Sequence, residues 1–313
     1  MRLEGIHHIS AITGDAARNL DFYTRVLGLR LVAKTVNQDD PSVYHLFYAD
    51  ERARAGSEMT FFEYPGALPG RPGDGMIHRI VWRVGGAPAL DFWAARLAAE
   101  GVETERDGDR LRFADPEGLG HEFAVTASTD TPLIAEHPEV PAELALQGFD
   151  SVRAYSSAPE RSAPILERLL GATPVDDSTW ELRGEVRGGT IAYDPPPAQP
   201  GRQSAGTVHH IAWGTTVAEH PKWETLLSEA GVPTSGIVDR RYFHSIYFRE
   251  PSGVLFEIAD DGPGFTVDSP IEELGRRIIL PPRFESSRER LEAALTPLPD
   301  PRAGWDAGKE IPA

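Results

Sequence analysis

Two pairs of adjacent histidines and one glutamate are the residues of this sequence that could together hold a metal ion. The pairs are His7-His8, near the start of the chain, and His209-His210, far along it, with Glu257 following the second pair. The chain contains no cysteine, so thiolate nucleophiles and disulfides are excluded and any metal must be held by His, Asp or Glu. Imidazole and carboxylate donors suit divalent transition metals.

A weak fourfold repeat relates these residues to one another. Each unit opens with a strand-like stretch and continues with a helix-like segment, and the predicted helices cover 16–27, 87–100, 158–170 and 218–230. A glycine follows each helix, where the left-handed conformation is expected. The distance from the equivalent residue of the opening strand to that glycine is 20, 22, 20 and 21 residues, for the pairs His8 and Gly28, Arg79 and Gly101, Ser151 and Gly171, and His210 and Gly231.

Strand-like runs and turns follow each glycine, so each unit reads as βαβββ. The closing strands can be compared four residues beyond their turn glycines, where the first unit has Thr60, the second Glu122 and the fourth Glu257. The third unit offers only Ala192 or Tyr193 at the matching place. Units one and four therefore supply His8, His210 and Glu257, whereas units two and three supply a set that cannot form a comparable metal site, namely Arg79, Ser151 and Glu122.

These units predict an α+β fold of four βαβββ modules, spanning residues 5–66, 75–127, 147–195 and 206–260. We expect the first two modules to form an N-terminal domain over residues 1–140 and the other two a C-terminal domain over 141–262. The tail, 263–313, is expected to carry one helix near 287–295. Since one module leaves its sheet uncovered, modules should pair into two cupped, barrel-like sheets, with modules 1 and 4 enclosing the metal site.

The composition narrows the class of protein. The 313 residues include 31 basic and 48 acidic side chains, for a formal net charge of −17. This balance argues against a partner made of nucleic acid and against binding to an anionic membrane surface. The sequence also has no apolar run of about 18 residues that could span a membrane, and its first residues include no apolar stretch as long as a signal peptide requires. We therefore expect a cytoplasmic protein.

Two imidazoles and one carboxylate form the ligand set known as a facial triad. Such a set leaves open positions on a divalent metal and suits Fe(II) oxygenases. The activation of O2 needs a redox metal at which substrate and oxygen can bind side by side, and zinc on the same ligands cannot pass electrons to oxygen. Apolar residues flank Glu257 on both sides, so its burial without a partner would be costly.

Several stretches of the sequence are typical of a known superfamily. Residues 22–29 match the passage from helix to strand in glyoxalase-like proteins, and 3–9, 43–50, 207–210 and 240–257 carry a closer likeness. The sequence resembles the vicinal oxygen chelate superfamily, and within it the four-module hydroquinone ring-cleaving dioxygenases. This resemblance implies Fe(II) as cofactor, with Mn(II) as an alternative, held by His8, His210 and Glu257. It also implies a small aromatic diol and O2 as substrates.

The resemblance further implies roles for four residues around the metal. Tyr247 would donate a hydrogen bond to the substrate, and Arg240 would stabilise developing anionic oxygen. His209 would act as an acid or base, and His7 would line or support the site. Strict strand alternation, in contrast, points His7 and His209 away from the face that carries the two ligand histidines.

Two other functions compete with the dioxygenase. A glyoxalase-type isomerase or lyase would bind Zn or Ni through four ligands, with Glu58 as the additional carboxylate. Thr60 at the matching position favours three ligands instead. A metal-free protein that binds a small molecule in the cup is the third hypothesis, and it predicts that the ligand set is lost. The sequence leaves open whether the chain forms a homo-oligomer.

Overall fold

The computed structural model describes residues 1–303 and 305, and it contains the four predicted βαβββ modules. Module 1 consists of β1 (Ile6–Thr13), α1 (Ala16–Asp21), the π-helical turn η1 (Phe22–Val26), β2 (Arg30–Val36), β3 (Tyr44–Ala49) and β4 (Glu58–Glu63). Module 2 consists of β5 (Ile77–Val84), α2 (Ala87–Ala99), β6 (Glu105–Asp107), β7 (Arg110–Ala114) and β8 (Gly120–Val125).

The second half of the chain repeats this order, with one change. Module 3 consists of β9 (Phe149–Tyr155), the short helices η2 (Pro159–Arg161) and η3 (Pro164–Leu169), β10 (Thr173–Asp176), β11 (Thr179–Arg183) and β12 (Gly188–Asp194). Module 4 consists of β13 (Thr207–Thr215), α3 (His220–Glu229), β14 (Thr234–Asp239), β15 (His244–Arg249) and β16 (Leu255–Asp260). The prediction of one continuous helix over 158–170 is wrong, because Pro164 cannot donate the backbone hydrogen bond of a regular helix.

The glycines that mark the repeat adopt the backbone conformation that the sequence predicts. Their φ angles lie between 71° and 73°, in the left-handed region, at Gly28, Gly101, Gly171 and Gly231. A side chain with a Cβ atom would be strained there. Each module thus ends its helical segment in the same way, and the chain then turns into the next strand of the sheet.

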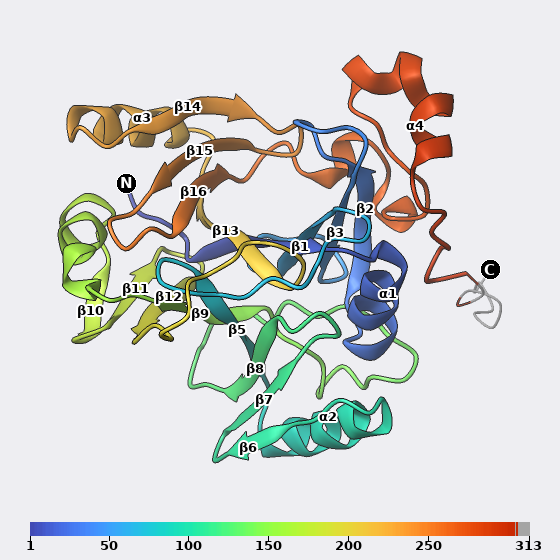
Figure 1. Ribbon diagram of the computed structural model, residues 1–313, viewed down its shortest axis with the longest axis horizontal. Helices are drawn as coiled ribbons and strands as arrows, with labels where there is room; N and C mark the ends of the chain where they lie inside the picture. The colour runs from blue at the N-terminus through green and yellow to red at the C-terminus, as the bar shows by residue number, and fades with distance from the viewer. Residues whose placement is uncertain (304, 306–313) are drawn as a thin grey trace.

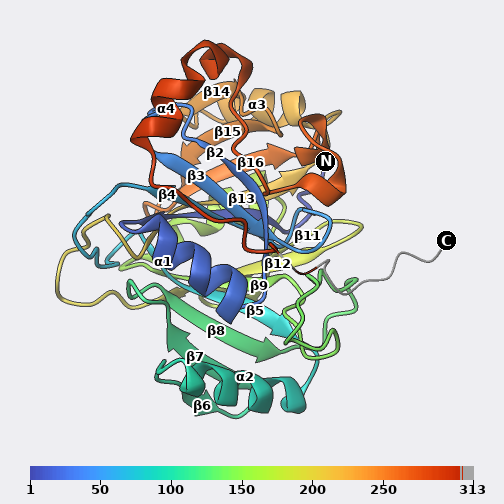
Figure 2. The ribbon, with the colours of Figure 1, turned by 90° about the vertical axis from the view of Figure 1, so that its right-hand side faces the viewer.

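The strands form two open eight-stranded sheets (Figure 1). Their orders are β14-β15-β16-β13-β1-β4-β3-β2 and β10-β11-β12-β9-β5-β8-β7-β6, so modules 4 and 1 build one sheet and modules 3 and 2 build the other. The first sheet occupies the upper part of the molecule and the second the lower part in both side views (Figure 2). The prediction of paired modules is confirmed, although each sheet has two edge strands and is not closed into a barrel.

The antiparallel pair of β1 and β13 lies at the centre of the first sheet. It joins the first module to the last, although about 200 residues separate their opening strands. In the second sheet, β5 and β9 pair in the same way and join modules 2 and 3. Each sheet therefore takes one module from each half of the sequence, and the division of the chain into domains at residue 140 remains a prediction.

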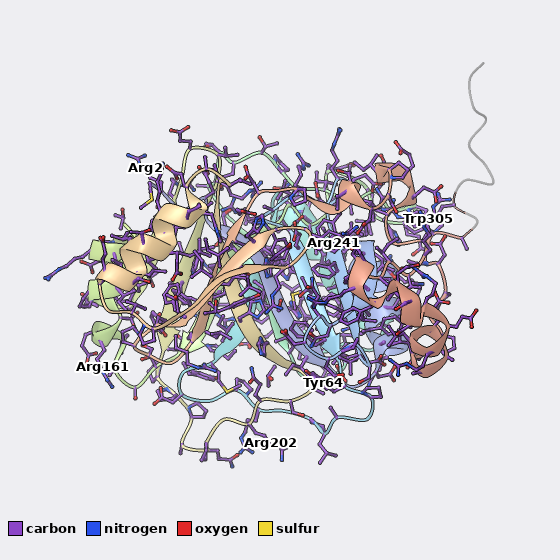
Figure 3. All side chains as sticks on the ribbon, turned by 90° about the horizontal axis from the view of Figure 1, so that it is seen from above. Arg2, Tyr64, Arg161, Arg202, Arg241 and Trp305 are labelled. Carbon is purple, nitrogen blue, oxygen red and sulfur yellow. The ribbon has the colours of Figure 1, made fainter. Side chains whose placement is uncertain are left out.

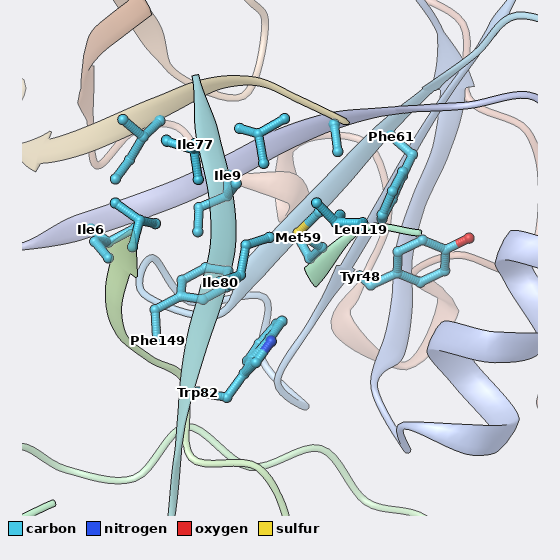
Figure 4. Close-up of a cluster of buried hydrophobic side chains, with 14 of the residues drawn as sticks. Ile6, Ile9, Tyr48, Met59, Phe61, Ile77, Ile80, Trp82, Leu119 and Phe149 are labelled. Atoms are coloured by element: carbon cyan, nitrogen blue, oxygen red, sulfur yellow. The ribbon is translucent and has the colours of Figure 1, made fainter. Parts of the chain in front are cut away.

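The main hydrophobic core lies where the two sheets meet. Strands β1 and β13 pack against β5, β9 and β12 of the other sheet. Figure 4 shows the side chains that fill this space, among them Ile9 of β1, Met59 of β4, Ile80 of β5 and Phe149 of β9. Alternation along β1 then directs His8 and Ser10 to the opposite face, away from this core.

The C-terminal tail packs on module 1. The backbone of Ile279 donates a hydrogen bond to the carbonyl of Lys34 in β2, and Leu280, Leu291 and Leu295 are buried. The helix predicted near 287–295 is confirmed as α4 (Arg288–Ala294). Residues 304 and 306–313 of the predicted tail lie outside the described residues. None of the described helices has the length and apolar character that crossing a bilayer requires.

A buried hydrogen-bonded network joins module 1 to module 2. The indole of Trp82 donates to Nδ1 of His121 at 3.1 Å, and Nε2 of His121 lies 2.8 Å from the hydroxyl of Tyr23. That hydroxyl donates to a carboxylate oxygen of Asp115 at 3.0 Å. A neutral imidazole has one acceptor nitrogen and one donor nitrogen. In His121 both have a partner, because Nδ1 accepts from Trp82 and Nε2 is left to donate to Tyr23.

We expect His121 to make stability fall at acid pH, an effect that Asp115 opposes below pH 6 because burial raises its pKa to about 6. Burial lowers the pKa of His121 from 6.5 to about 3. Below pH 6.5 the unfolded chain takes up a proton that the folded chain does not, so the stabilisation from this residue is complete above pH 6.5 and is lost as the pH falls towards 3. The slope is about 1.4 kcal/mol per pH unit for one such proton.

The variant His121→Gln isolates this contribution, since glutamine does not titrate. We expect it to be less stable than the wild type at pH 7.5 and to lose less stability between pH 6.5 and 4.5. Urea unfolding at a series of pH values measures both quantities. Parallel stability curves for the two proteins would contradict a neutral, buried His121.

Candidate metal centre

Two β-bulges, at His7 and His209, shape the face that carries the candidate ligands. In the ladder between β1 and β13 the register shifts twice, so that these two residues have no partner across the strands, while His8 pairs with Ala212 and Ser10 with His210. A bulge re-aims the side chain of its extra residue. The prediction from strict alternation is therefore wrong: the rings of His7 and His209 contact those of His8 and His210.

Three ligand atoms converge at the centre of this face. Nε2 of His8 and Nε2 of His210 lie 3.2 Å apart, and Oε2 of Glu257 lies 3.2 Å from the first and 2.9 Å from the second. All three side chains are buried, with exposed fractions of 4% or less. The structure thus brings together the three residues that the sequence predicts, from β1, β13 and β16.

Each of these side chains is oriented by a further contact. Nδ1 of His8 lies 3.1 Å from Nδ1 of His7, and Nδ1 of His210 lies 2.7 Å from Nδ1 of His209. The other oxygen of Glu257 accepts a hydrogen bond from the hydroxyl of Ser245. Partners of this kind fix the tautomer and the direction of metal ligands. They leave one nitrogen of each ligand histidine aimed at the common centre.

The pKa shifts of His210 and Glu257 favour the charge states that a divalent metal requires. Burial lowers the pKa of His210, although the neighbouring carboxylate opposes this. Burial by itself would raise the pKa of Glu257, but the two imidazoles beside it hold that pKa well below its usual range. These shifts favour a neutral imidazole at His210 and an ionised carboxylate at Glu257, the unprotonated forms that bind a metal.

The arrangement of the donor atoms suits metal coordination better than it suits hydrogen bonds among the three side chains. Oε2 of Glu257 is buried without a well-formed hydrogen bond, despite its short distances to both nitrogens. Three adjacent ligands bound at about 2.1 Å around an octahedral ion lie roughly 3 Å apart. The separations of 2.9 to 3.2 Å match this arrangement. These residues therefore fit a divalent ion with one face of its coordination sphere left open.

Module 1 supplies no fourth ligand at this centre. Thr60 of module 1 occupies the position that Glu257 has in module 4, because Thr60 pairs with Ser10 and Glu257 pairs with Ala212 in the sheet. Module 1 therefore has a hydroxyl at the position where a four-ligand site would need a second carboxylate. Glu58, the alternative carboxylate, forms a separate group with His7 and His8, in which its Oε2 lies 3.9 Å from Nδ1 of His7. Burial raises the pKa of Glu58 well above its usual value, which favours a neutral carboxyl group.

A cavity of about 340 Å³ opens beside the three ligands. Its aromatic lining comprises Phe47, Phe62, Tyr64, Tyr242, Phe243 and Tyr247, and both candidate ligand histidines reach it. Figure 3 shows Tyr64 and Arg241 of this lining on the side of the molecule that lies between α3 and α4. A space of this size and character suits a small, flat, aromatic molecule with a few polar groups.

The polar groups on the module 4 side of the cavity form a pair. Nε of Arg240 lies 3.2 Å from the hydroxyl of Tyr247, and its guanidinium carbon lies 5.2 Å from the centre of that ring. Arg240 also reaches Asp39 of module 1 at 3.1 Å. Arg241 instead pairs with Asp268 of the tail. Tyr247, Arg240 and His209 thus line one cavity, whereas His7 supports His8 from behind and is absent from the lining.

Several polar residues of the lining were missed by the sequence reasoning, and two of them lie on inward-facing strand positions. His45 of β3 and Ser10 of β1 both reach the cavity, and both contact the hydroxyl of Thr60. The signal that could have identified them is alternation, because Ser10 is two residues beyond His8 and His45 is two residues before Phe47. Polar residues at inward-facing positions of two neighbouring strands point to a common site.

The equivalent positions of the second sheet hold an ion-pair cluster. Glu122, at the place of Glu257, accepts hydrogen bonds from Arg79, Arg110 and Arg112. Arg79 itself stands at the place of His8, and its guanidinium satisfies the buried carboxylate without a metal. Each sheet thus has a buried glutamate on a closing strand, which contacts arginines in the second sheet and two imidazoles in the first.

The chain belongs to a large family of this fold. The model of the Glyoxalase/Bleomycin resistance protein/Dioxygenase superfamily matches residues 5–123 and 148–258. The two matches cover modules 1 and 2 and modules 3 and 4.

Relatives of similar length carry more specific names. The chain is 39% identical to the proposed ring-cleaving dioxygenase MhqA of Bacillus subtilis, over 95% of this chain and all of the relative. It is 32% identical to the chlorohydroquinone/hydroquinone 1,2-dioxygenase of Sphingobium indicum, over 93% of this chain and 95% of that protein.

Solved structures agree with the fold. The crystal structure of a proposed dioxygenase from Bacillus subtilis superimposes with a TM-score of 0.88 at 36% identity, over 96% of this chain and 98% of that one. Glyoxalase I from Zea mays superimposes with a TM-score of 0.56 at 16% identity, over 82% of this chain and 92% of that one, which shows the fold alone.

Substitution of each candidate ligand should abolish metal binding and leave the fold intact. His8→Ala, His210→Ala and Glu257→Ala each remove one of three donors, so we expect loss of bound Fe(II) in anaerobic metal analysis and an unchanged circular dichroism spectrum. Ser151→Ala, at the position equivalent to His210 in the second sheet, is the matched control and should bind metal normally. Retention of stoichiometric iron by any two of the ligand variants would count against this centre.

Proposed function

We propose that the protein is an Fe(II)-dependent dioxygenase that cleaves the ring of a hydroquinone-type aromatic diol. The observation that carries this proposal is the set of three buried donors, His8, His210 and Glu257, beside a cavity with aromatic walls. The position of Thr60 supports it further, because a fourth protein ligand would take a place that substrate or oxygen needs. The names of the relatives in Bacillus subtilis and Sphingobium indicum point to the same reaction.

The chain would hold the ion through the three donors and leave the side facing the cavity to the substrates. Bound Fe(II) supplies exchangeable positions and the electrons that O2 activation requires. The aromatic walls of the cavity bury the ring of the diol and exclude water from it. One carboxylate with two neutral imidazoles leaves the centre with a positive charge, which favours an ionised hydroxyl of the substrate over a neutral one.

Tyr247 and His209 are suited to donate hydrogen bonds to the substrates. Burial raises the pKa of Tyr247, with the charge of Glu257 adding to this, so the phenol stays neutral. Its oxygen accepts a hydrogen bond from the Nε–H of Arg240, and Tyr247 lines the cavity in which a substrate oxygen would lie. For His209, burial lowers the pKa to about 4. If Nδ1–H of His210 donates a hydrogen bond to Nδ1 of His209, Nε2–H of His209 remains as a donor.

Arg240 contributes charge that does not depend on pH. Its guanidinium lies against Tyr247 and is held across the cavity by Asp39, and its backbone carbonyl accepts from the side chain of Gln38. Preorganised positive charge of this kind stabilises anionic oxygen as it develops during a reaction. The same contacts tie module 1 to module 4 at the rim of the cavity.

The test of this proposal is O2 consumption by the Fe(II)-loaded protein. We expect uptake of one O2 per molecule of hydroquinone with loss of the aromatic absorbance, and no uptake by the protein loaded with Zn(II), because zinc cannot pass electrons to oxygen. Activity of a Ni or Zn form on a thiol–aldehyde adduct, without O2 uptake by the iron form, would replace the dioxygenase with an isomerase or lyase.

Removal of the Tyr247 hydroxyl should slow the reaction without loss of metal. For Tyr247→Phe we expect kcat/KM with hydroquinone to fall on the order of 100-fold, since one donor to developing negative charge is lost. Steady-state oxygen-electrode kinetics measure the change, with iron content as the internal control. Wild-type kinetics in this variant would restrict Tyr247 to a packing role.

A further inference from the structure

A chain of three polar side chains crosses module 1 beside the candidate metal centre. Nε2 of His45 lies 3.0 Å from the hydroxyl of Thr60, which lies 2.6 Å from the hydroxyl of Ser10. Thr60 is fully buried in the middle of this chain. His45 and Ser10, at its two ends, both line the cavity. The chain thus begins and ends at the space in which the substrate would bind.

The ring of His45 is held in a fixed position. It lies between two phenylalanines, with ring centres 4.0 Å from that of Phe47 and 4.2 Å from that of Phe62. Burial lowers the pKa of His45 well below its usual value, and His8 and His210 act in the same direction. A neutral imidazole has one donor and one acceptor. In the described part of the chain Thr60 is the hydrogen-bond partner of His45, and Nδ1 remains available to a ligand.

His45 lies at a distance from the metal centre that the second hydroxyl of a bound 1,4-diol could span. In the order β1-β4-β3 it stands two strands away from His8, with a strand spacing of about 4.8 Å. The hydroxyls of a 1,4-diol lie at opposite ends of the ring, whereas those of a 1,2-diol are adjacent and stay together near the metal. The second hydroxyl of a 1,4-diol needs a partner, because burial of a polar group without one is costly.

We propose that His45 binds the second hydroxyl of a 1,4-diol and thereby selects hydroquinones over catechols, an assignment that rests on the dioxygenase function proposed above. Thr60 and Ser10 are the positioning residues of this subsite. Their hydroxyls can each donate or accept, so the chain can run in either direction. His45 can then offer the substrate a lone pair or an N–H at Nδ1 without a change in its own charge.

The variant His45→Phe tests this assignment by comparing two ligands. Phenol has the same ring as hydroquinone and lacks the second hydroxyl. We expect the Kd of hydroquinone for the anaerobic, Fe(II)-loaded protein to rise roughly 3- to 10-fold, as for the loss of one hydrogen bond, and the Kd of phenol to stay unchanged. Isothermal titration calorimetry measures both. His244→Phe, a like substitution on the face of β15 opposite Tyr247 and outside the cavity lining, is the control and should change neither value.

A second variant tests the same assignment without placing a new phenylalanine side chain in the cavity. Thr60→Val preserves volume and removes the hydroxyl that holds His45, and we expect a smaller loss for hydroquinone with phenol again unaffected. In turnover, the ratio of kcat/KM for hydroquinone to that for catechol should fall in both variants.

The outcomes separate this assignment from the proposed function. Equal weakening of hydroquinone and phenol in His45→Phe, or no weakening of either, would overturn the role of His45 even if the wild-type protein consumes O2. Absence of O2 uptake by the wild type, in contrast, would overturn the dioxygenase and leave the ratio of the two dissociation constants as a valid test of the subsite.

Discussion

The mutual approach of two imidazole nitrogens and one carboxylate oxygen is the interaction on which the rest of this structure depends. These atoms lie 2.9 to 3.2 Å apart on buried side chains, and the carboxylate oxygen has no well-formed hydrogen bond. Lone pairs held so close together are unfavourable without a cation between them. The fold therefore carries a cost at this point that binding of a divalent ion would reverse.

The strand pair β1–β13 makes that approach possible. It stands between the first and last modules, and a bulge in each strand turns both members of a histidine pair towards the site. One histidine of each pair presents Nε2 to the centre, and its neighbour contacts the Nδ1 behind it. The same two bulges thus explain why His8 and His210 have the geometry of ligands and why His7 and His209 differ from them in role.

The cavity divides its chemistry between two modules. Module 4 contributes Arg240, Tyr247 and His209, whose charge and donors suit oxygen and the reacting end of a substrate. Module 1 contributes part of the aromatic walls and the hydrogen-bonded chain of His45, Thr60 and Ser10. The second sheet has the same strand order but fills the matching place with arginines around Glu122. The two sheets thus share one arrangement of strands, and the first carries the donors of the candidate metal centre.

The sequence alone determined the repeat, the paired modules and the three donors, because helix-ending glycines and closing-strand turns recur at fixed spacing and local rules govern both. It could not determine the bulges, since the extra residue of a bulge is defined only by the partner strand, and so alternation placed His7 and His209 on the wrong face. Nor could it single out His45, whose importance comes from Thr60 on a neighbouring strand. Contacts between strands are decided by register, and register is a property of the folded sheet.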